Sequence, residues 1–114
     1  MKERNILSRT PRDLHDKTVV ITGASSGVGK ATALEMARCG AKVVLAARRE
    51  KALEELAAEC ESIGARALVV PTDVTDSKAV QTLAATAKAW GGNIDVWVNN
   101  AGLLAAGAFD ETPI

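Results

Sequence analysis

Short apolar runs alternate with longer segments of helical periodicity along most of this chain. Four short apolar runs lie at residues 18–22, 42–47, 67–70 and 94–99. Apolar runs as short as these are typical of strands that are buried on both faces. Apolar residues recur instead at helical spacing in three segments, at residues 28–39, 50–63 and 77–90. The pattern predicts four strands that alternate with three helices.

The helical segments have apolar faces and clear boundaries. The residues expected to face the sheet are Val28, Ala31, Leu34 and Ala37 in the first helix, and Leu53, Leu56, Ala57 and Cys60 in the second. Gly40 and Gly64 directly follow these two helices, as glycine commonly does where a helix ends. Thr75 or Asp76 is expected to cap the third helix.

A strict alternation of strands and helices with short loops predicts the α/β class. The expected fold is a Rossmann-type doubly wound parallel sheet with helices on both faces. Right-handed crossovers would place the four strands in the order 3-2-1-4. The strand order then reverses between the first and the fourth strand, and ligands of such sheets bind in the crevice at that point.

Three glycines follow the first predicted strand at the spacing Gly-x-x-x-Gly-x-Gly. Gly23 would let the chain turn sharply, Gly27 would let backbone N–H groups approach an anion, and Gly29 would let the next helix pack closely. Unpaired N–H groups and the positive end of the helix dipole would face that anion, as at a dinucleotide pyrophosphate. A glycine cluster of this kind also occurs in turns that bind nothing.

The same glycines do not form the phosphate-binding loop of ATPases. That motif would need Gly where Ala24 stands and Ser or Thr where Ala31 stands. Lys30 is therefore expected to be a solvated side chain in the first turn of the helix.

Composition and charge exclude several other classes. Lys plus Arg equals Asp plus Glu at 14 each, so no nucleic-acid surface is indicated. No apolar run approaches the roughly 20 residues that span a bilayer, and residues 1–16 form a polar leader or arm without the apolar core of a secretion signal. Cys39 and Cys60 lack metal-ligand spacing and are expected to be buried thiols of a cytoplasmic protein.

Three motifs, each at the carboxyl end of a predicted strand, resemble the short-chain dehydrogenase/reductase family. They are Thr22-Gly23-Ala24-Ser25-Ser26-Gly27-Val28-Gly29, Asp73-Val74 and Asn99-Asn100-Ala101-Gly102. The resemblance covers about residues 14–114. It implies that residues 17–114 are the N-terminal half of an NAD(P)-binding Rossmann domain.

The resemblance also implies roles for individual residues. Backbone groups of the glycine turn would hold the pyrophosphate and the adjoining ribose. Asp73 would accept a hydrogen bond from the adenine amino group, with Val74 packed against the ring, although a turn carboxylate is the alternative for Asp73. The Asn-Asn pair would also tie neighbouring strands together. The residues expected to bind the cofactor are Gly23, Ala24, Ser25, Ser26, Gly27, Val28, Gly29, Arg48, Arg49, Asp73, Val74, Asn100, Ala101 and Gly102.

The choice between NADP and NAD is argued from charge. An acidic residue about 20 positions beyond the glycines would bind the ribose hydroxyl of NAD and repel a 2′-phosphate. Ala47 occupies that place, and Arg48 and Arg49 follow it. Guanidinium groups bind phosphate with paired hydrogen bonds, so NADP is favoured over NAD. Two arginines after a strand could instead be a solvated turn, and the neutral Ser26 stands where many NADP-dependent members carry a second basic residue.

The activity implied by the resemblance is hydride transfer between the nicotinamide and a small carbonyl compound or secondary alcohol. In the family, proton transfer uses a Ser and a Tyr-x-x-x-Lys pair beyond the fourth strand, and this chain contains no Tyr. We therefore expect this chain to supply cofactor-binding residues and no catalytic residues. The resemblance also implies that the full-length protein is a homo-oligomer. A non-catalytic NADP-sensing module and a structural subunit without cofactor are the alternatives.

Overall fold

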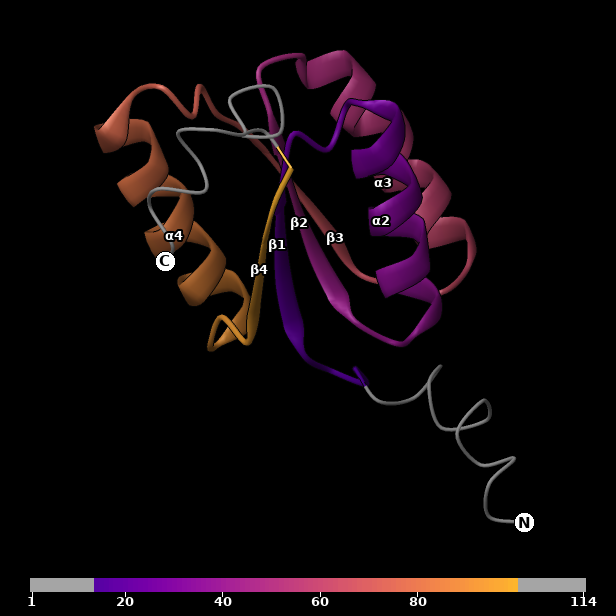
Figure 1. Ribbon diagram of the computed structural model, residues 1–114. Helices are drawn as coiled ribbons and strands as arrows, with labels where there is room; N and C mark the ends of the chain where they lie inside the picture. The colour runs from indigo at the N-terminus through magenta and orange to yellow at the C-terminus, as the bar shows by residue number, and fades with distance from the viewer. Residues whose placement is uncertain (1–13, 101–114) are drawn as a thin grey trace, which may run out of the picture.

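In the computed structural model, which describes residues 14–100, one parallel sheet is covered by helices on both faces (Figure 1). The strand order is β3-β2-β1-β4 and all neighbouring pairs are parallel. This order confirms the prediction. The elements are β1 (Thr18–Thr22), α2 (Gly27–Arg38), β2 (Lys42–Ala47), α3 (Glu50–Ser62), β3 (Ala67–Pro71), α4 (Ser77–Gly91) and β4 (Val96–Asn99).

The core has two layers because alternate residues of each strand face opposite sides of the sheet. Helices α2 and α3 cover one face, and α4 covers the other (Figure 1). The layer under α2 and α3 contains Val19, Ile21, Val43, Leu45 and Leu53 among its buried residues. The layer under α4 contains Val20, Val44, Ala46, Leu83 and Ala87. All five residues of β1 are buried, so this strand is the centre of the molecule.

The inward face of α2 differs from the prediction. Its buried residues are Gly29, Ala33 and Ala37, whereas Ala31 is exposed and Val28 is 56% exposed. The buried residues follow one another at intervals of four and are all small, which lets the helix lie close to the strands. The prediction was wrong at Val28 and Ala31 because it followed the apolar side chains rather than the space available to them.

Helices α3 and α4 agree more closely with the sequence. The buried residues of α3 are the four expected from its periodicity, Leu53, Leu56, Ala57 and Cys60. Asp76 is the N-cap of α4, and its side chain accepts hydrogen bonds from the N–H groups of Lys78 and Ala79. Cys39 and Cys60 are both buried, as expected.

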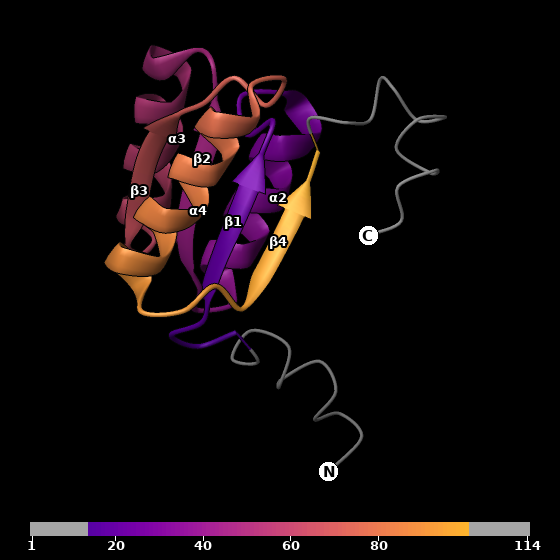
Figure 2. The same cartoon turned by 90° about the vertical axis from the view of Figure 1, so that its left-hand side faces the viewer.

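The fourth strand starts two residues later than predicted. The N–H of Asp95 donates to the carbonyl oxygen of Thr18 at 2.9 Å, and the Oδ2 of Asp95 accepts from the N–H of Thr18 at 2.9 Å. The register of paired residues then begins with Val19 and Val96. Strand β4 lies at an edge of the four-stranded sheet (Figure 2). Trp97 in this strand is 37% exposed, so part of its indole is accessible at this edge.

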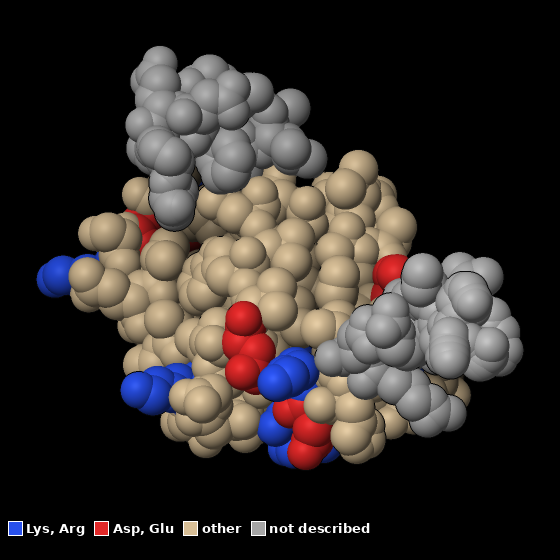
Figure 3. All heavy atoms as spheres, turned by 60° about the horizontal axis from the view of Figure 1, so that its bottom comes forward, with Lys and Arg blue, Asp and Glu red and all other residues tan. Residues whose placement is uncertain are grey.

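The amino-end edge of the sheet, where the strands begin, is closed by hydrogen bonds between distant parts of the chain. The carbonyl oxygen of Gly91 accepts from the hydroxyl of Thr18 at 3.2 Å and from the ammonium of Lys42 at 3.0 Å. Figure 3 looks toward this side and shows acidic and basic side chains interspersed rather than separated into an acidic and a basic patch. None of the helices within residues 14–100 combines the length and the apolar character that crossing a membrane requires.

Candidate functional site

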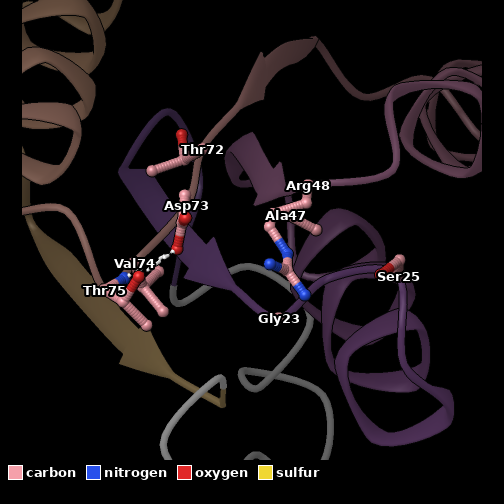
Figure 4. Close-up of a pocket in the computed structure, with 8 residues that line it drawn as sticks. All are labelled: Gly23, Ser25, Ala47, Arg48, Thr72, Asp73, Val74 and Thr75. Atoms are coloured by element: carbon pink, nitrogen blue, oxygen red, sulfur yellow. Dashed lines mark hydrogen bonds between the residues drawn. The ribbon is translucent and has the colours of Figure 1, made fainter.

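A hollow of about 420 Å³ opens at the carboxyl ends of β1, β2 and β3. Its lining comes from three loops that are far apart in the sequence (Figure 4). The lining residues are Gly23, Ser25, Ala47, Arg48, Thr72, Asp73, Val74 and Thr75. The fold therefore brings the glycine turn, Arg48 and the Asp73-Val74 pair to one place.

The glycine turn has the tight geometry that the sequence predicts. Gly23 has a φ of 64°, in the left-handed region that favours glycine. The next residue, Ala24, is fully buried and its N–H donates to the carbonyl oxygen of Ala46 at 3.1 Å. A Cβ on Gly29 would lie 2.8 Å from the Cα of Ala24 and closer still to the carbonyl oxygen of Gly23. Gly29 therefore lets α2 pack directly on the turn.

The N-terminus of α2 presents N–H groups toward solvent. The hydroxyl of Ser26 caps the helix by accepting from the N–H of Gly29 at 3.0 Å, and it donates to the carbonyl oxygen of Gly23 at 2.9 Å. The N–H of Ser26 also donates to that oxygen, so both polar hydrogens of Ser26 are used inside the turn. Within the described part of the chain, the N–H groups of Ser25, Gly27 and Val28 donate to no other group. These three groups are available to an anion.

Gly27 differs from the other glycines of the turn. A Cβ added to it would meet no atom within 4 Å. The space in front of it is open, so Gly27 is not required for packing of the protein itself. Such an opening at a helix N-terminus allows a ligand to approach the backbone closely.

The two arginines after β2 lie in different surroundings. Arg48 lines the hollow, and Figure 4 shows its guanidinium extending from the end of β2 toward the glycine turn. Arg49 is the N-cap of α3, without a side-chain capping bond. It lines a separate surface depression with Glu50, Lys51 and Ala52. The structure thus places Arg48, and not Arg49, beside the other predicted site residues.

Asp73 follows β3 and belongs to a tight turn at the rim of the hollow. Its Oδ1 accepts hydrogen bonds from the N–H of Thr75 at 2.9 Å and from the hydroxyl of Thr75 at 2.6 Å. These two hydrogen bonds, and to a smaller extent the positive charge of Arg48, hold the pKa of Asp73 below its usual range. Asp73 is a turn carboxylate in this structure, yet one of its oxygens is still available to a ligand.

Asn99, the last residue of β4, has the structural role expected of the Asn-Asn pair. The hydroxyl of Thr22 donates to the Oδ1 of Asn99 at 2.9 Å, which ties β1 to β4. The side-chain nitrogen of Asn100 is buried without a hydrogen-bond partner among the described residues. Ala101 and Gly102 lie outside the described residues.

Three residues that line the hollow are absent from the predicted set: Ala47, which was considered only for its missing charge, Thr72 and Thr75. Thr72 is buried, and its hydroxyl donates to the carbonyl oxygen of Val70 at 2.8 Å. Thr75 makes both hydrogen bonds to Asp73. A signal for Thr75 was present, because an Asp side chain commonly bonds the backbone two residues further along in a turn. Nothing in the local pattern distinguishes Thr72 from an ordinary residue after a strand.

Together these groups can bind an anionic ligand. Unpartnered N–H groups and a guanidinium can bind phosphate oxygens. A carboxylate on the opposite rim can accept hydrogen bonds from an amino group. Within residues 14–100, no cluster of His, Cys, Asp and Glu is suited to hold a metal ion.

Comparison with known families gives one match over most of the chain. A family model described as short chain dehydrogenase matches residues 17–114. The chain is 47% identical over 102 residues to the uncharacterized oxidoreductase YxnA of Bacillus subtilis (strain 168), which covers 89% of this chain and 29% of that protein. It is 39% identical over 102 residues to an L-rhamnose 1-dehydrogenase (NAD(P)(+)) of a Sphingomonas species, covering 89% of this chain and 40% of that protein.

Solved structures agree with this result. A hydroxysteroid dehydrogenase from Escherichia coli superimposes with a TM-score of 0.76 at 33% identity, over 81% of this chain and 39% of that chain. A short-chain type dehydrogenase/reductase from Mycobacterium marinum superimposes with a TM-score of 0.72 at 40% identity, over 75% of this chain and 34% of that chain. The chain spans well under half the length of each of these relatives.

Proposed function

Since this chain belongs to the short-chain dehydrogenase family, we propose that residues 17–114 bind NADP as the cofactor-binding part of an oxidoreductase. The reaction would be hydride transfer between the nicotinamide and a small carbonyl compound or secondary alcohol. The bound cofactor supplies the hydride chemistry, and the residues of this chain bind and orient it. We assign none of them to proton transfer.

The choice of NADP over NAD rests on two neighbouring residues of the hollow, Ala47 and Arg48. Ala47 ends β2 and lines the hollow, where an acidic residue would accept hydrogen bonds from the ribose of NAD. Because Ala47 has no carboxylate, nothing at that position repels a 2′-phosphate. The Arg48 guanidinium beside it supplies a charge-assisted donor. Among the described residues Arg48 forms no ion pair within 4 Å, so its charge is available to a ligand. Ser25 lies on the same rim and offers a hydroxyl (Figure 4).

The rest of the cofactor would extend from the hollow along the glycine turn. The pyrophosphate would lie against the N–H groups of Ser25, Gly27 and Val28, in the open space in front of Gly27. The adenine ring would pack on the exposed side chain of Val74, with its amino group toward Asp73. Asn100, Ala101 and Gly102 would line the ribose at the nicotinamide end.

The setting of the protein is part of the same proposal. Buried thiols at Cys39 and Cys60 agree with a reduced cytoplasmic environment. The assembly would be a homo-oligomer that acts on small molecules. The L-rhamnose dehydrogenase among its relatives has both cofactors in its name, so the choice of NADP here rests on the residues of this chain.

Binding of NADPH and NADH to the full chain, measured by calorimetry, tests the proposal. We expect the wild-type chain to prefer NADPH, because only NADPH carries the 2′-phosphate. Arg48→Glu should weaken NADPH binding by roughly tenfold or more, the scale of one lost charge-assisted contact. It should leave NADH binding within a factor of about three, because the pyrophosphate contacts remain.

Matched charge reversals make the test specific. Arg49→Glu changes the neighbouring residue outside the hollow, and Arg38→Glu changes a residue of α2 that pairs with Glu35. Both should affect NADPH much less than Arg48→Glu does. Equal weakening of both cofactors by Arg48→Glu, or a wild-type preference for NADH, would refute the choice of NADP. A folded chain that binds neither cofactor would contradict the cofactor-binding function itself.

A further inference from the structure

We propose that Thr75 is a positioning residue for adenine recognition, because it holds one oxygen of the Asp73 carboxylate and leaves the other for the ligand. This inference rests on the proposed function, in which Asp73 accepts a hydrogen bond from the adenine amino group. Thr75 itself would not need to touch the cofactor.

The hydrogen bonds at Asp73 are all made to one of its two oxygens. The N–H and the hydroxyl of Thr75 both donate to Oδ1, at 2.9 Å and 2.6 Å. Within residues 14–100, no hydrogen bond reaches Oδ2. Figure 4 shows the two side chains joined at the rim of the hollow, with Val74 beside them. Two donors on one oxygen restrict rotation of the carboxylate and define where Oδ2 lies.

The backbone around Asp73 is held independently of Thr75. The N–H of Thr72 donates to the carbonyl oxygen of Ala47 at 2.8 Å, and the N–H of Asp76 donates to the carbonyl oxygen of Asp73 at 3.0 Å. Asp76 in turn caps α4. The hydroxyl of Thr75 is therefore not the main support of the turn, and its clearest remaining effect is on the carboxylate.

The charges near Asp73 favour its ionised form. Both hydrogen bonds from Thr75 lower the pKa of Asp73, the side-chain bond most, and Arg48 on the opposite rim lowers it further. Asp76 is the other carboxylate in this segment, and its oxygen is occupied by the N–H groups at the start of α4. An ionised carboxylate accepts hydrogen bonds more strongly than a neutral acid. Thr75 would thus both orient Asp73 and keep it charged as the pH falls.

A pH series of NADP⁺ binding to the full chain separates this role from a purely structural one. The variants are Thr75→Val, which keeps the shape but removes the hydroxyl, Thr75→Ser, which keeps the hydroxyl, and Asp73→Asn, which cannot titrate. Thr82→Val, at an exposed position of α4, is the control for the substitution itself. Circular dichroism at each pH establishes that every variant is folded.

At neutral pH we expect Thr75→Val to bind NADP⁺ about threefold more weakly than wild type, the scale of one exposed hydrogen bond. Removing the hydroxyl raises the pKa of Asp73 toward its ordinary value. The acid-side loss of affinity should therefore begin at a higher pH in Thr75→Val than in wild type. Thr75→Ser should follow wild type, and Asp73→Asn should lack this step. Titration of the 2′-phosphate is common to all variants and cancels in the comparison.

The outcomes distinguish this inference from the proposed function. If wild type binds NADP⁺ and Thr75→Val has the same affinity and the same pH profile, the positioning role is wrong and the cofactor site stands. Equal weakening of Thr75→Val and Thr75→Ser, without a shifted profile, would also overturn the positioning role. If folded wild type does not bind NADP⁺ at any pH, the proposed function fails instead.

Discussion

The two ends of the sheet use their polar groups in opposite ways. At the amino-end edge, the polar groups bond one another: Thr18 bonds Asp95 and Gly91, and Lys42 also bonds Gly91. At the carboxyl-end edge, several donors and acceptors have no partner within the described residues, including the N–H groups of Gly27 and Val28. Unpaired groups are costly when buried but inexpensive in contact with water. The comparison shows which edge stabilises the fold and which is open to a ligand.

Glycines lie at both ends of the sheet, and of Gly27, Gly29 and Gly91 only Gly27 faces open space. Gly29 and Gly91 are both required for packing, since a Cβ on either would collide with a neighbouring segment. A Cβ on Gly27 would meet no atom within 4 Å. Replacing each glycine by alanine can therefore test packing at both edges of the sheet and ligand access at the carboxyl-end edge.

The largest effect should come from Gly29→Ala. Its Cβ would collide with the backbone of Gly23 and Ala24, which cannot move without opening the turn. We expect the free energy of unfolding to fall by roughly 3 kcal/mol, at the upper end of overpacking effects, with loss of cofactor binding. Denaturant unfolding followed by circular dichroism measures this. A variant as stable as wild type would mean that α2 does not pack on the turn as described.

Gly91→Ala should reduce stability alone. The new Cβ would lie 2.7 Å from the Cγ2 of Thr18 and closer to its hydroxyl oxygen. We expect a loss of roughly 2 kcal/mol in the free energy of unfolding, with unchanged NADPH affinity of the folded protein. Because the clash is with one side chain, the added Thr18→Ala substitution should recover part of the loss in a double-mutant cycle. Weaker NADPH binding by the folded variant would show that the amino-end edge also affects cofactor binding.

Gly27→Ala should have the smallest effect on stability and still weaken binding. With open space beside this residue, we expect the free energy of unfolding to change by less than about 1 kcal/mol. The methyl group would occupy the approach to the N–H groups of α2, so NADPH affinity should fall about tenfold. Calorimetry beside thermal unfolding checks both values. Unchanged affinity in a folded variant would show that the pyrophosphate does not approach this position.

The fold was predictable because its signals are local and agree with one another. The predicted strands, the strand order and the buried face of α3 are all present in the structure. The face of α2 was predicted wrongly, because contact between Gly29 and the turn matters more there than side-chain hydrophobicity. The late start of β4 likewise depends on Asp95 bonding to Thr18, 77 positions away in the chain.

The candidate site was predictable in its parts and less so in its arrangement. The glycine motif, Arg48 and Asp73 are each visible in the sequence. The separation of Arg48 from Arg49 depends on where α3 begins, since Arg49 caps that helix. The binding of NADP at these residues stays a prediction for the experiments above to test.

The sequence alone determined the class of the protein, because strand and helix periodicities and the glycine turn are local properties of consecutive residues. Only the tertiary structure decided which polar groups are satisfied within the chain and which are left open to a ligand. That distinction depends on contacts between segments far apart in sequence, such as Thr18 with Gly91 and Ala47 with Thr72. Local periodicity carries no information about such pairs, so the open edge of the sheet could be identified residue by residue only in three dimensions.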